Sequence, residues 1–222
     1  MYGENIKMKV LCYTPSYNRP KMLRSCIQDV QNQSYKNTFH IVNVTLDDIT
    51  NQENVKYIFN DLSYDNLKII YTQNNSRNHT NYINTISAID YTDYDIFVKI
   101  DDDDIYKKDY ISNIVKAFEK PNYDVLTSKI NTQLNGHKIK RGNYNNLGGD
   151  QRVKMPMTLA FNKKALDVLL DIKPFGKLSD TLWRKEWIKN NMNFGVVDNN
   201  ENVIWYIHGK NISTSNFLDT KR

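Results

Sequence analysis

The stretch "DIFVKIDDDDIY" (residues 95–106) joins a short apolar run to four consecutive aspartates. An apolar run of this length, with β-branched and aromatic residues, predicts a buried strand. The aspartates Asp101–Asp104 follow this strand directly, so rigid structure is expected to position their carboxylates. Neighbouring carboxylates repel, and the repulsion grows where water is excluded. A bound cation is one way to relieve it.

The aspartate run has two interpretations. One is a solvated acidic loop that caps the helix expected near Lys107, since carboxylates favour a helix N-terminus. The other is a divalent-metal site, because Mg²⁺ and Mn²⁺ take one or two carboxylates together with substrate phosphates. If strand geometry continues, Asp101 and Asp103 project to one side and Asp102 and Asp104 to the other. An EF-hand is excluded, because its glycine and terminal glutamate are missing.

Strand and helix patterns alternate along the chain around this stretch. We expect strands over 9–14, 39–46, 67–72, 95–100 and 123–130, and helices over 20–30, 54–62, 81–90 and 107–120. This alternation predicts an α/β fold with a largely parallel sheet covered on both faces. Ligands bind beyond the carboxyl ends of the strands in such sheets, and the aspartate run lies at one of these ends.

The second half of the chain is less regular. Residues 131–154 are polar and rich in glycine and asparagine, which predicts a long loop or an irregular hairpin. Regular patterns resume with expected strands over 155–161, 193–197 and 202–208 and expected helices over 163–172 and 179–191.

Composition limits the class of protein. The chain has 222 residues, of which 40% are hydrophobic and 25% charged, enough for one sizeable core. Cys12 and Cys26 fall in an expected strand and helix, which indicates a reducing compartment rather than a disulfide framework. No signal peptide or membrane span is expected, so we predict a cytoplasmic location. The net charge of +5 leaves a nucleotide, a phospholipid surface and a nucleic acid open as anionic partners.

Several stretches, in order, resemble signature segments of family 2 GT-A glycosyltransferases. They are "VLCYTPSYNRPKMLRSCIQDVQNQSYKN" (10–37), "NNSRNHTNYINTISAI" (74–89), "YDIFVKIDDDDIY" (94–106), "LSDTLWRKEW" (178–187) and "YIHGKNIST" (206–214). The resemblance implies a GT-A fold: a Rossmann-like, mostly parallel central sheet flanked by helices, with a smaller mixed acceptor-side region. It also implies one domain over 1–222, with a nucleotide-sugar-binding half (1–104) and an acceptor and catalytic half (105–222).

The resemblance also implies residues for the donor. The nucleotide base would be held by the first loop and the end of the second strand, that is by Thr14, Pro15, Tyr17, Arg19 and one of Asp47 or Asp48. The family's D-D-G-S is here "LDDITN", without its glycine. Arg77 or Asn78 would face the diphosphate. Within the run, Asp103 would bind the metal, with Asp101 and Asp102 towards the ribose or a second ligand position, and this register stays open by one residue.

Catalytic roles follow from the same resemblance. Asp180 matches the family's catalytic aspartate, the general base that takes a proton from the acceptor hydroxyl, although it would also serve as a helix N-cap. His208 would be a further metal ligand and, with Lys210, would help neutralise the leaving diphosphate, or it would be a structural residue.

Two further groups are candidates for the acceptor side. Trp183 would stack on a sugar acceptor or pack in the core, as would Trp187 and Trp205. Lys138, Lys140 and Arg141 give a cationic segment that would meet a phosphorylated or lipid-diphosphate acceptor, or simply be solvated.

The function expected from the sequence is an inverting, metal-dependent glycosyltransferase. It would use Mn²⁺ or Mg²⁺ and a nucleotide diphosphate sugar, with a UDP-sugar favoured. The acceptor would be a glycan, a glycolipid or a lipid-linked molecule, as in polysaccharide biosynthesis; no nucleic acid partner is expected, and peripheral membrane association stays open. Two alternatives are a sugar nucleotidyltransferase, whose G-x-G loop is missing, and a non-catalytic carbohydrate- or nucleic-acid-binding domain, which would not require the aspartates.

Overall fold

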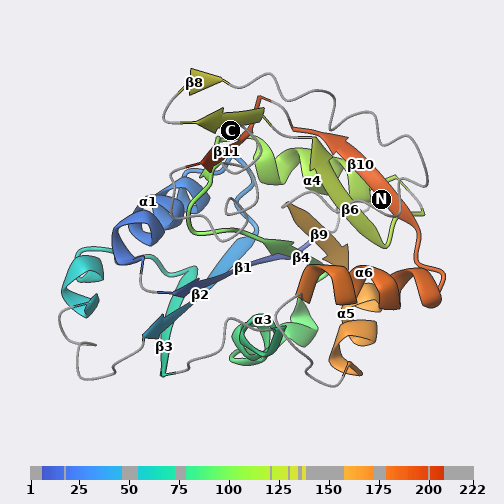
Figure 1. Cartoon of the computed structure of the whole chain (residues 1–222), viewed down its shortest axis with the longest axis horizontal. Helices are drawn as coiled ribbons and strands as arrows, with labels where there is room; N and C mark the ends of the chain where they lie inside the picture. Colours follow the sequence, from blue (N-terminus) through green and yellow to red (C-terminus); the bar gives the residue numbers. More distant parts are fainter. Residues whose placement is uncertain are drawn as a thin grey trace, which may run out of the picture.

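The central feature of the fold is a seven-stranded sheet (Figure 1). The computed structural model describes residues 7–17, 19–46, 55–73, 79–120, 122–129, 131–134, 137–138, 158–172, 179–199 and 201–207. The strands are ordered β10-β6-β9-β4-β1-β2-β3, and β9 runs antiparallel to both of its neighbours while the other pairs are parallel. Their bounds are β1 Val10–Tyr17, β2 Thr38–Leu46, β3 Leu67–Gln73, β4 Ile96–Lys99, β6 Val125–Lys129, β9 Leu159–Asn162 and β10 Phe194–Asp198.

A second, smaller sheet has the order β5-β11-β7-β8. Its strands are β5 Ile105–Tyr106, β7 Asn131–Leu134, β8 His137–Lys138 and β11 Val203–Ile207. The helices are α1 Pro20–Gln31, α3 His79–Ser87, α4 Tyr110–Phe118, α5 Lys163–Leu170 and α6 Ser179–Lys189, with 3₁₀ turns η2 Tyr57–Phe59 and η3 Tyr91–Asp93. The predicted α/β class with a largely parallel sheet is confirmed.

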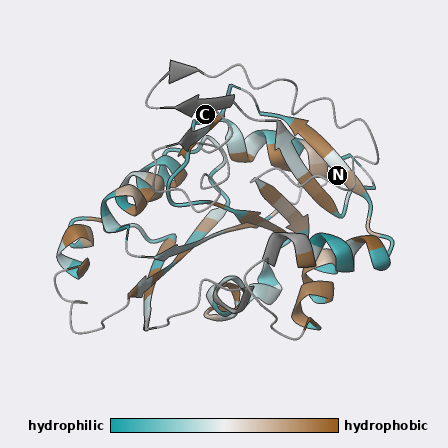
Figure 2. Cartoon of the chain, in the orientation of Figure 1, coloured by the Kyte–Doolittle hydropathy of each residue, from teal (hydrophilic) through white to brown (hydrophobic). Residues whose placement is uncertain are grey.

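The two faces of the large sheet bury separate cores. On β1, Val10 and Cys12 point into a core that α1 and α4 cover, whereas Leu11 and Tyr13 point into a core that α3, α5 and α6 cover. A strand that is buried on both faces has a continuous run of apolar residues in its sequence. The apolar run at the start of β1 therefore predicted a strand covered on both sides. Figure 2 shows mainly hydrophobic strands at the centre, between helices that carry both polar and apolar faces.

Two predicted segments differ from the structure. The helix expected over 54–62 is shorter, because η2 ends at Phe59 and the N–H of Leu62 bonds the Phe59 carbonyl. A continuing helix would direct that N–H to the Ile58 carbonyl, which instead accepts from Arg24 of α1. Of the long polar segment, β7 and β8 pair antiparallel, and residues 135–136 and 139–154 lie outside the described residues.

Cys12 and Cys26 are free, buried thiols, as the sequence predicted. None of the helices in the described part of the chain combines the length and apolar composition that a bilayer crossing needs. The large sheet takes strands from both predicted halves, because β9 lies between β4 and β6. The division of labour between residues 1–104 and 105–222 stays a prediction.

The strand order creates a switch point between β1 and β4. The chain leaves β1 towards β2 and β3 on one side, and later returns through β4 on the other side of β1. At such a point the connections after two neighbouring parallel strands diverge, which opens a crevice at their carboxyl ends. The aspartate run follows β4 and therefore begins at this crevice.

The buried His40 predicts a pH-dependent stability. His40 is 0% exposed, its Nε2 lies 2.9 Å from Thr14 Oγ1, and burial lowers its pKa from 6.5 to about 3. Below pH 6.5 the unfolded chain takes a proton that the folded chain does not, so the free energy of unfolding falls by up to about 1.4 kcal/mol per pH unit. Urea unfolding at pH 7 and at pH 5 should therefore show that His40→Gln loses less stability than the wild type as the pH falls. Parallel profiles for the two proteins would contradict this prediction.

Candidate functional site

One arginine holds two members of the aspartate run. Arg19, the residue before α1, donates from Nε to Asp102 Oδ2 at 3.1 Å, and its Nη2 pairs with the second oxygen of the same carboxylate. Its Nη1 pairs with Asp103. Ser16, near the end of β1, donates its hydroxyl to Asp102 Oδ2 at 2.5 Å. These contacts join the end of β1 and the start of α1 to the residues that follow β4.

Burial alternates along the run, although β4 ends at Lys99 and the run itself forms a turn rather than a continued strand. Asp102 and Asp104 are buried, at 2% and 5% exposed, whereas Asp101 and Asp103 are partly exposed. Burial raises the pKa of Asp102 to about 7, although the Arg19 charge and the Ser16 hydrogen bond act in the opposite direction. Asp102 therefore lies deepest in the site, while the side chains of Asp101 and Asp103 keep exposed fractions of 18% and 10%.

A buried lysine at the end of β4 holds a third aspartate. Lys99 is 4% exposed, and its Nζ lies 3.0 Å from Asp101 Oδ1 and 3.2 Å from Oδ2. The sequence analysis did not single out Lys99. The sequence does contain a signal for Lys99, which is a charged residue within the otherwise apolar strand "IFVKI" (96–100). Lysine is rarely buried unless it is paired, so a lysine at such a position indicates a buried partner.

Tyr106 closes the aspartate run into a loop. Its side-chain hydroxyl accepts the Asp101 backbone N–H at 2.8 Å. Its own backbone N–H donates to the Asp29 carboxylate of α1 at 2.9 Å. Burial raises the pKa of Tyr106 well above its usual value, so this hydroxyl stays protonated. Both ends of the run are therefore tied to structure that is fixed elsewhere.

The residues after the run are held by Gln33. This side chain is 1% exposed, and its Nε2 donates to the carbonyls of Tyr106 at 3.3 Å and Lys107 at 2.8 Å. Its Oε1 accepts the Ile111 N–H at 3.0 Å, and the neighbouring Ser34 N–H donates to the Lys108 carbonyl at 2.8 Å. The "NQSY" segment (residues 32–35) lies in a stretch that resembles family 2 glycosyltransferases. Here it holds the backbone that follows the aspartate run.

No ready-made metal site is formed by the residues that the structure describes. Among them, no group of three or more His, Cys, Asp or Glu side chains is arranged to hold an ion. Carboxylates are still the oxygen donors that Mn²⁺ and Mg²⁺ prefer. The carboxylates of Asp101 and Asp103 thus suit part of a metal shell that further ligands complete. His208, the other predicted ligand, lies outside the described residues.

The remaining predicted donor residues lie at different depths. Thr14 is 0% exposed and its hydroxyl meets His40, so its side chain lies beneath the site and does not face a nucleotide. Pro15 and Tyr17 are partly exposed on the same strand, β1. Arg19, predicted as a base contact, instead holds aspartates in this structure. The other predicted positions outside the described residues are Asp47, Asp48, Arg77, Asn78, Lys140 and Arg141.

The predicted catalytic and acceptor residues fall on α6 and β8. Asp180 is the second residue of α6, and Lys138 is the last residue of β8. Trp183 is 0% exposed, and its ring packs 6.0 Å from that of Trp187 and 5.2 Å from that of Tyr82. The core-packing alternative therefore describes Trp183, whose ring does not face an acceptor here.

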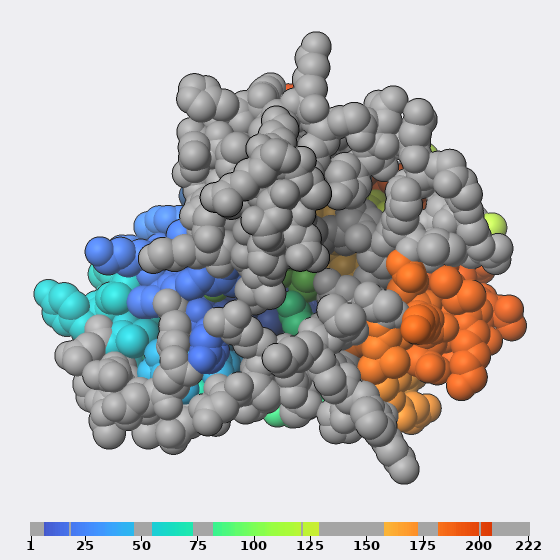
Figure 3. Space-filling model, in the orientation of Figure 1, coloured from blue at the N-terminus to red at the C-terminus, as the bar shows by residue number. Residues whose placement is uncertain are grey.

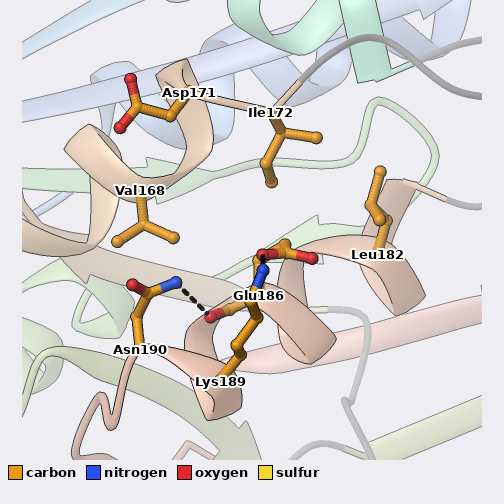
Figure 4. Close-up of a pocket in the computed structure, with 7 residues that line it drawn as sticks. All are labelled: Val168, Asp171, Ile172, Leu182, Glu186, Lys189 and Asn190. Carbon is orange, nitrogen blue, oxygen red and sulfur yellow. Dashed lines mark hydrogen bonds and ion pairs between the residues drawn. The ribbon is translucent and has the colours of Figure 1, made fainter.

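A separate hollow of about 490 Å³ lies between α5 and α6 (Figure 4). Three of its polar residues contact one another: Lys189 pairs with Glu186 at 3.4 Å, and Asn190 donates to the Glu186 carbonyl at 2.9 Å. The other lining residues are Val168, Asp171, Ile172 and Leu182. Figure 3 shows α5 and α6, in orange, at one end of the face viewed and the start of the chain, in blue, at the other. None of the residues that hold the aspartate run lines this hollow.

The support from Gln33 can be tested by Gln33→Leu. Leucine fills similar space but leaves the buried Ile111 N–H without its acceptor, so the free energy of unfolding should fall by about 1–3 kcal/mol. Urea unfolding measures the change. Gln28→Leu, at an exposed position of α1, is the matched control and should change stability little. Equal effects at the two positions would show that Gln33 does not hold the segment.

Comparisons with known proteins agree with this geometry. A family model described as glycosyl transferase family 2 matches residues 12–176. The search of curated protein sequences returned no significant match. Similar solved structures include S. aureus TarS in complex with UDP-GlcNAc, with a TM-score of 0.67 and 17% identity over 94% of this chain and 61% of that chain.

Two further structures are similar. TarS in a second crystal structure has a TM-score of 0.67 and 20% identity, over 90% of this chain and 60% of that chain. A mannosyltransferase, PcManGT from Pyrobaculum calidifontis, in complex with GDP-Man and Mn²⁺, has a TM-score of 0.56 and 14% identity, over 87% and 57%. The chain thus spans about 60% of these relatives, and the likeness shows the GT-A fold. Because the family model covers well over half of the sequence, the chain belongs to glycosyl transferase family 2.

Proposed function

We propose that this chain transfers a sugar from a nucleotide diphosphate donor, with a UDP-sugar favoured, to an acceptor hydroxyl, with the help of a divalent metal ion. The observation that carries the proposal is the aspartate run, which lies at the switch point between β1 and β4 and in which Asp101 and Asp103 are less buried than Asp102 and Asp104. A nucleotide bound in this crevice would bring its diphosphate to those carboxylates. Family membership favours glycosyl transfer over nucleotidyl transfer or simple binding.

The choice of donor is supported by the similar structures. TarS was solved in complexes with UDP-GlcNAc and with UDP, and PcManGT with GDP-Man and Mn²⁺. Uridine and guanosine donors thus both occur on this fold. We favour UDP because the TarS structures have the higher TM-scores.

Asp103 would hold the metal ion, with His208 as a further ligand. When bound, the ion would neutralise the charge that develops on the leaving diphosphate. Arg19 would remain beside Asp103 as a second positive charge at this edge. A charge fixed in place before the reaction needs no reorganisation as the leaving group departs.

Asp180 would act as the general base. A carboxylate can accept the proton of the acceptor hydroxyl as that oxygen attacks the anomeric carbon. Attack from the face opposite the leaving diphosphate inverts the configuration at that carbon. Asp180 lies in the first turn of α6, whose Trp183 and Trp187 anchor the helix in the core. The helix therefore provides a rigid support for the base.

The acceptor is proposed to be a glycan or a lipid-linked molecule. Lys138 on β8, with Lys140 and Arg141, would offer positive charge to a phosphorylated or lipid-diphosphate acceptor.

Metal dependence can be tested by thermal unfolding with UDP. At about 100 times its dissociation constant, UDP should raise the melting temperature by roughly 5–10 °C in Mn²⁺ and much less in EDTA. Asp103→Asn should lose the additional rise in melting temperature that depends on Mn²⁺. Asp65→Asn, at an exposed turn, is the matched control. Equal shifts in Mn²⁺ and EDTA would refute a metal-dependent donor site.

The role of Asp180 can be tested by hydrolysis of UDP-sugars, in which water replaces the acceptor. Asp180→Asn keeps the shape of the side chain but removes the base, so hydrolysis should fall by about 10²–10⁴-fold. Thermal protection by UDP and Mn²⁺ should persist. Asp167→Asn, at an exposed position of α5, is the control and should keep normal hydrolysis. A folded Asp180→Asn protein with normal hydrolysis would assign Asp180 to helix capping.

A further inference from the structure

Lys99 is a buried charge in the middle layer of the fold. It lies on β4 at 4% exposed, in register with Tyr13 of β1 and Leu159 of β9, which are themselves buried. An ammonium in such surroundings is costly unless it is paired. A methionine or leucine would fill the same space without that cost, so packing alone does not explain the lysine.

The pairing of Lys99 is specific. Its Nζ lies at nearly equal distances from the two carboxylate oxygens of Asp101, 3.0 and 3.2 Å, and 5.3 Å from the centre of the Tyr82 ring of α3. Residues two apart on an extended chain project to the same side, which brings this lysine and this aspartate together. The ammonium is thus held between a carboxylate and an aromatic ring, both of which favour a cation.

We propose that Lys99 is a positioning residue that keeps Asp101 in an internal ion pair and thereby leaves Asp103 as the aspartate that receives the metal ion. The inference rests on the proposed function and deepens it, because it selects the metal ligand within the run. Asp101 could bind the ion only by weakening its pair with Lys99, which would leave a buried ammonium poorly compensated. Asp103, by contrast, pairs with only one nitrogen of Arg19, and the other two nitrogens pair with Asp102. Arg19 would therefore keep a carboxylate partner if Asp103 bound the ion.

A different role for Lys99 is direct contact with the diphosphate of the donor. The structure favours positioning, since the side chain is almost wholly buried and its ammonium already meets a carboxylate and a ring. The two roles predict opposite effects of removing the charge. Loss of a positioning lysine releases negative charge and strengthens binding of Mn²⁺ alone. Loss of a diphosphate contact weakens binding of UDP even in EDTA.

The experiment compares Lys99→Met, Asp101→Asn and the double variant. Binding of Mn²⁺ without nucleotide is followed by the electron paramagnetic resonance signal of the free ion. Lys99→Met should bind Mn²⁺ about tenfold more tightly than the wild type, because the Asp101 carboxylate has lost its partner. The double variant removes one charge of each sign. It should return to the wild-type affinity for Mn²⁺ within about threefold.

Lys164→Met is the matched control. Lys164 also pairs with an aspartate, Asp124, at 3.0 Å, but its side chain is 60% exposed and its partner lies outside the aspartate run. This variant should leave Mn²⁺ binding unchanged. A comparable gain in the control would mean that any lost lysine raises Mn²⁺ affinity, which would overturn the specific role of Lys99.

Three results would overturn the proposal. Unchanged Mn²⁺ binding by Lys99→Met is the first. The second is a double variant that binds Mn²⁺ without nucleotide much more weakly than the wild type, because Asp101 would then be a metal ligand. The third is a loss of UDP affinity in EDTA by Lys99→Met, which would assign the lysine to the diphosphate.

Unfolding by urea in EDTA tests the ion pair without any ligand. The double variant should be more stable than the sum of the two single effects predicts, and strict additivity would overturn the pairing. A wild-type protein that shows no Mn²⁺-dependent UDP binding would refute the proposed function, and the positioning role with it. Normal wild-type binding with unchanged Mn²⁺ affinity in Lys99→Met would refute the positioning role alone.

Discussion

The burial of Asp102 is the constraint on which the rest of the site depends. A carboxylate at 2% exposed requires partners, and it receives them from Arg19 and Ser16, more than eighty residues earlier in the chain. Those two residues lie at the end of β1 and just before α1, so the pairing aligns the first strand and helix with the end of β4. Removal of Arg19 would take away the charge that opposes the raised pKa of Asp102, and the buried carboxyl would take up a proton. The same contacts that organise the site therefore also set the protonation of its buried carboxyl.

Two kinds of interaction fix the aspartate run from opposite sides. Cationic side chains, Arg19 and Lys99, hold the carboxylates themselves. Hydrogen bonds from Gln33 and Tyr106 hold the backbone on either side of them. Carboxylates that repel one another would otherwise spread apart, so the charges and the backbone must be restrained together. The result is a set of acidic groups in place before any ligand binds, which lowers the cost of ordering a metal and a diphosphate there.

The sequence predicted those features that depend on local pattern. "DIFVKI" and its neighbours follow periods that burial on one or two faces imposes, and the strands and helices they predicted are confirmed with shifts of a few residues. What it did not show depends on partners distant in the chain. The bond from Arg24 to the Ile58 carbonyl shortened an expected helix, and the partners of Asp101 and Asp102 were not visible in the run itself. Four identical residues carry no local signal of which one faces the ligand.

The donor side and the proposed acceptor side of the site are built on different sheets. The aspartate run ends in β5, which pairs with β11 of the small sheet, and β11 also pairs with β7, where the polar segment 131–154 begins. The donor side is thus built on the large sheet and its two cores, while the segment proposed to meet the acceptor extends from a sheet only four strands wide. Changes there would disturb neither the burial of Asp102 nor the packing of β1 and β4. An enzyme built in this way can change its acceptor while it keeps its donor site, because the contacts that hold Asp102 come from Ser16 and Arg19, far in the chain from the segment 131–154.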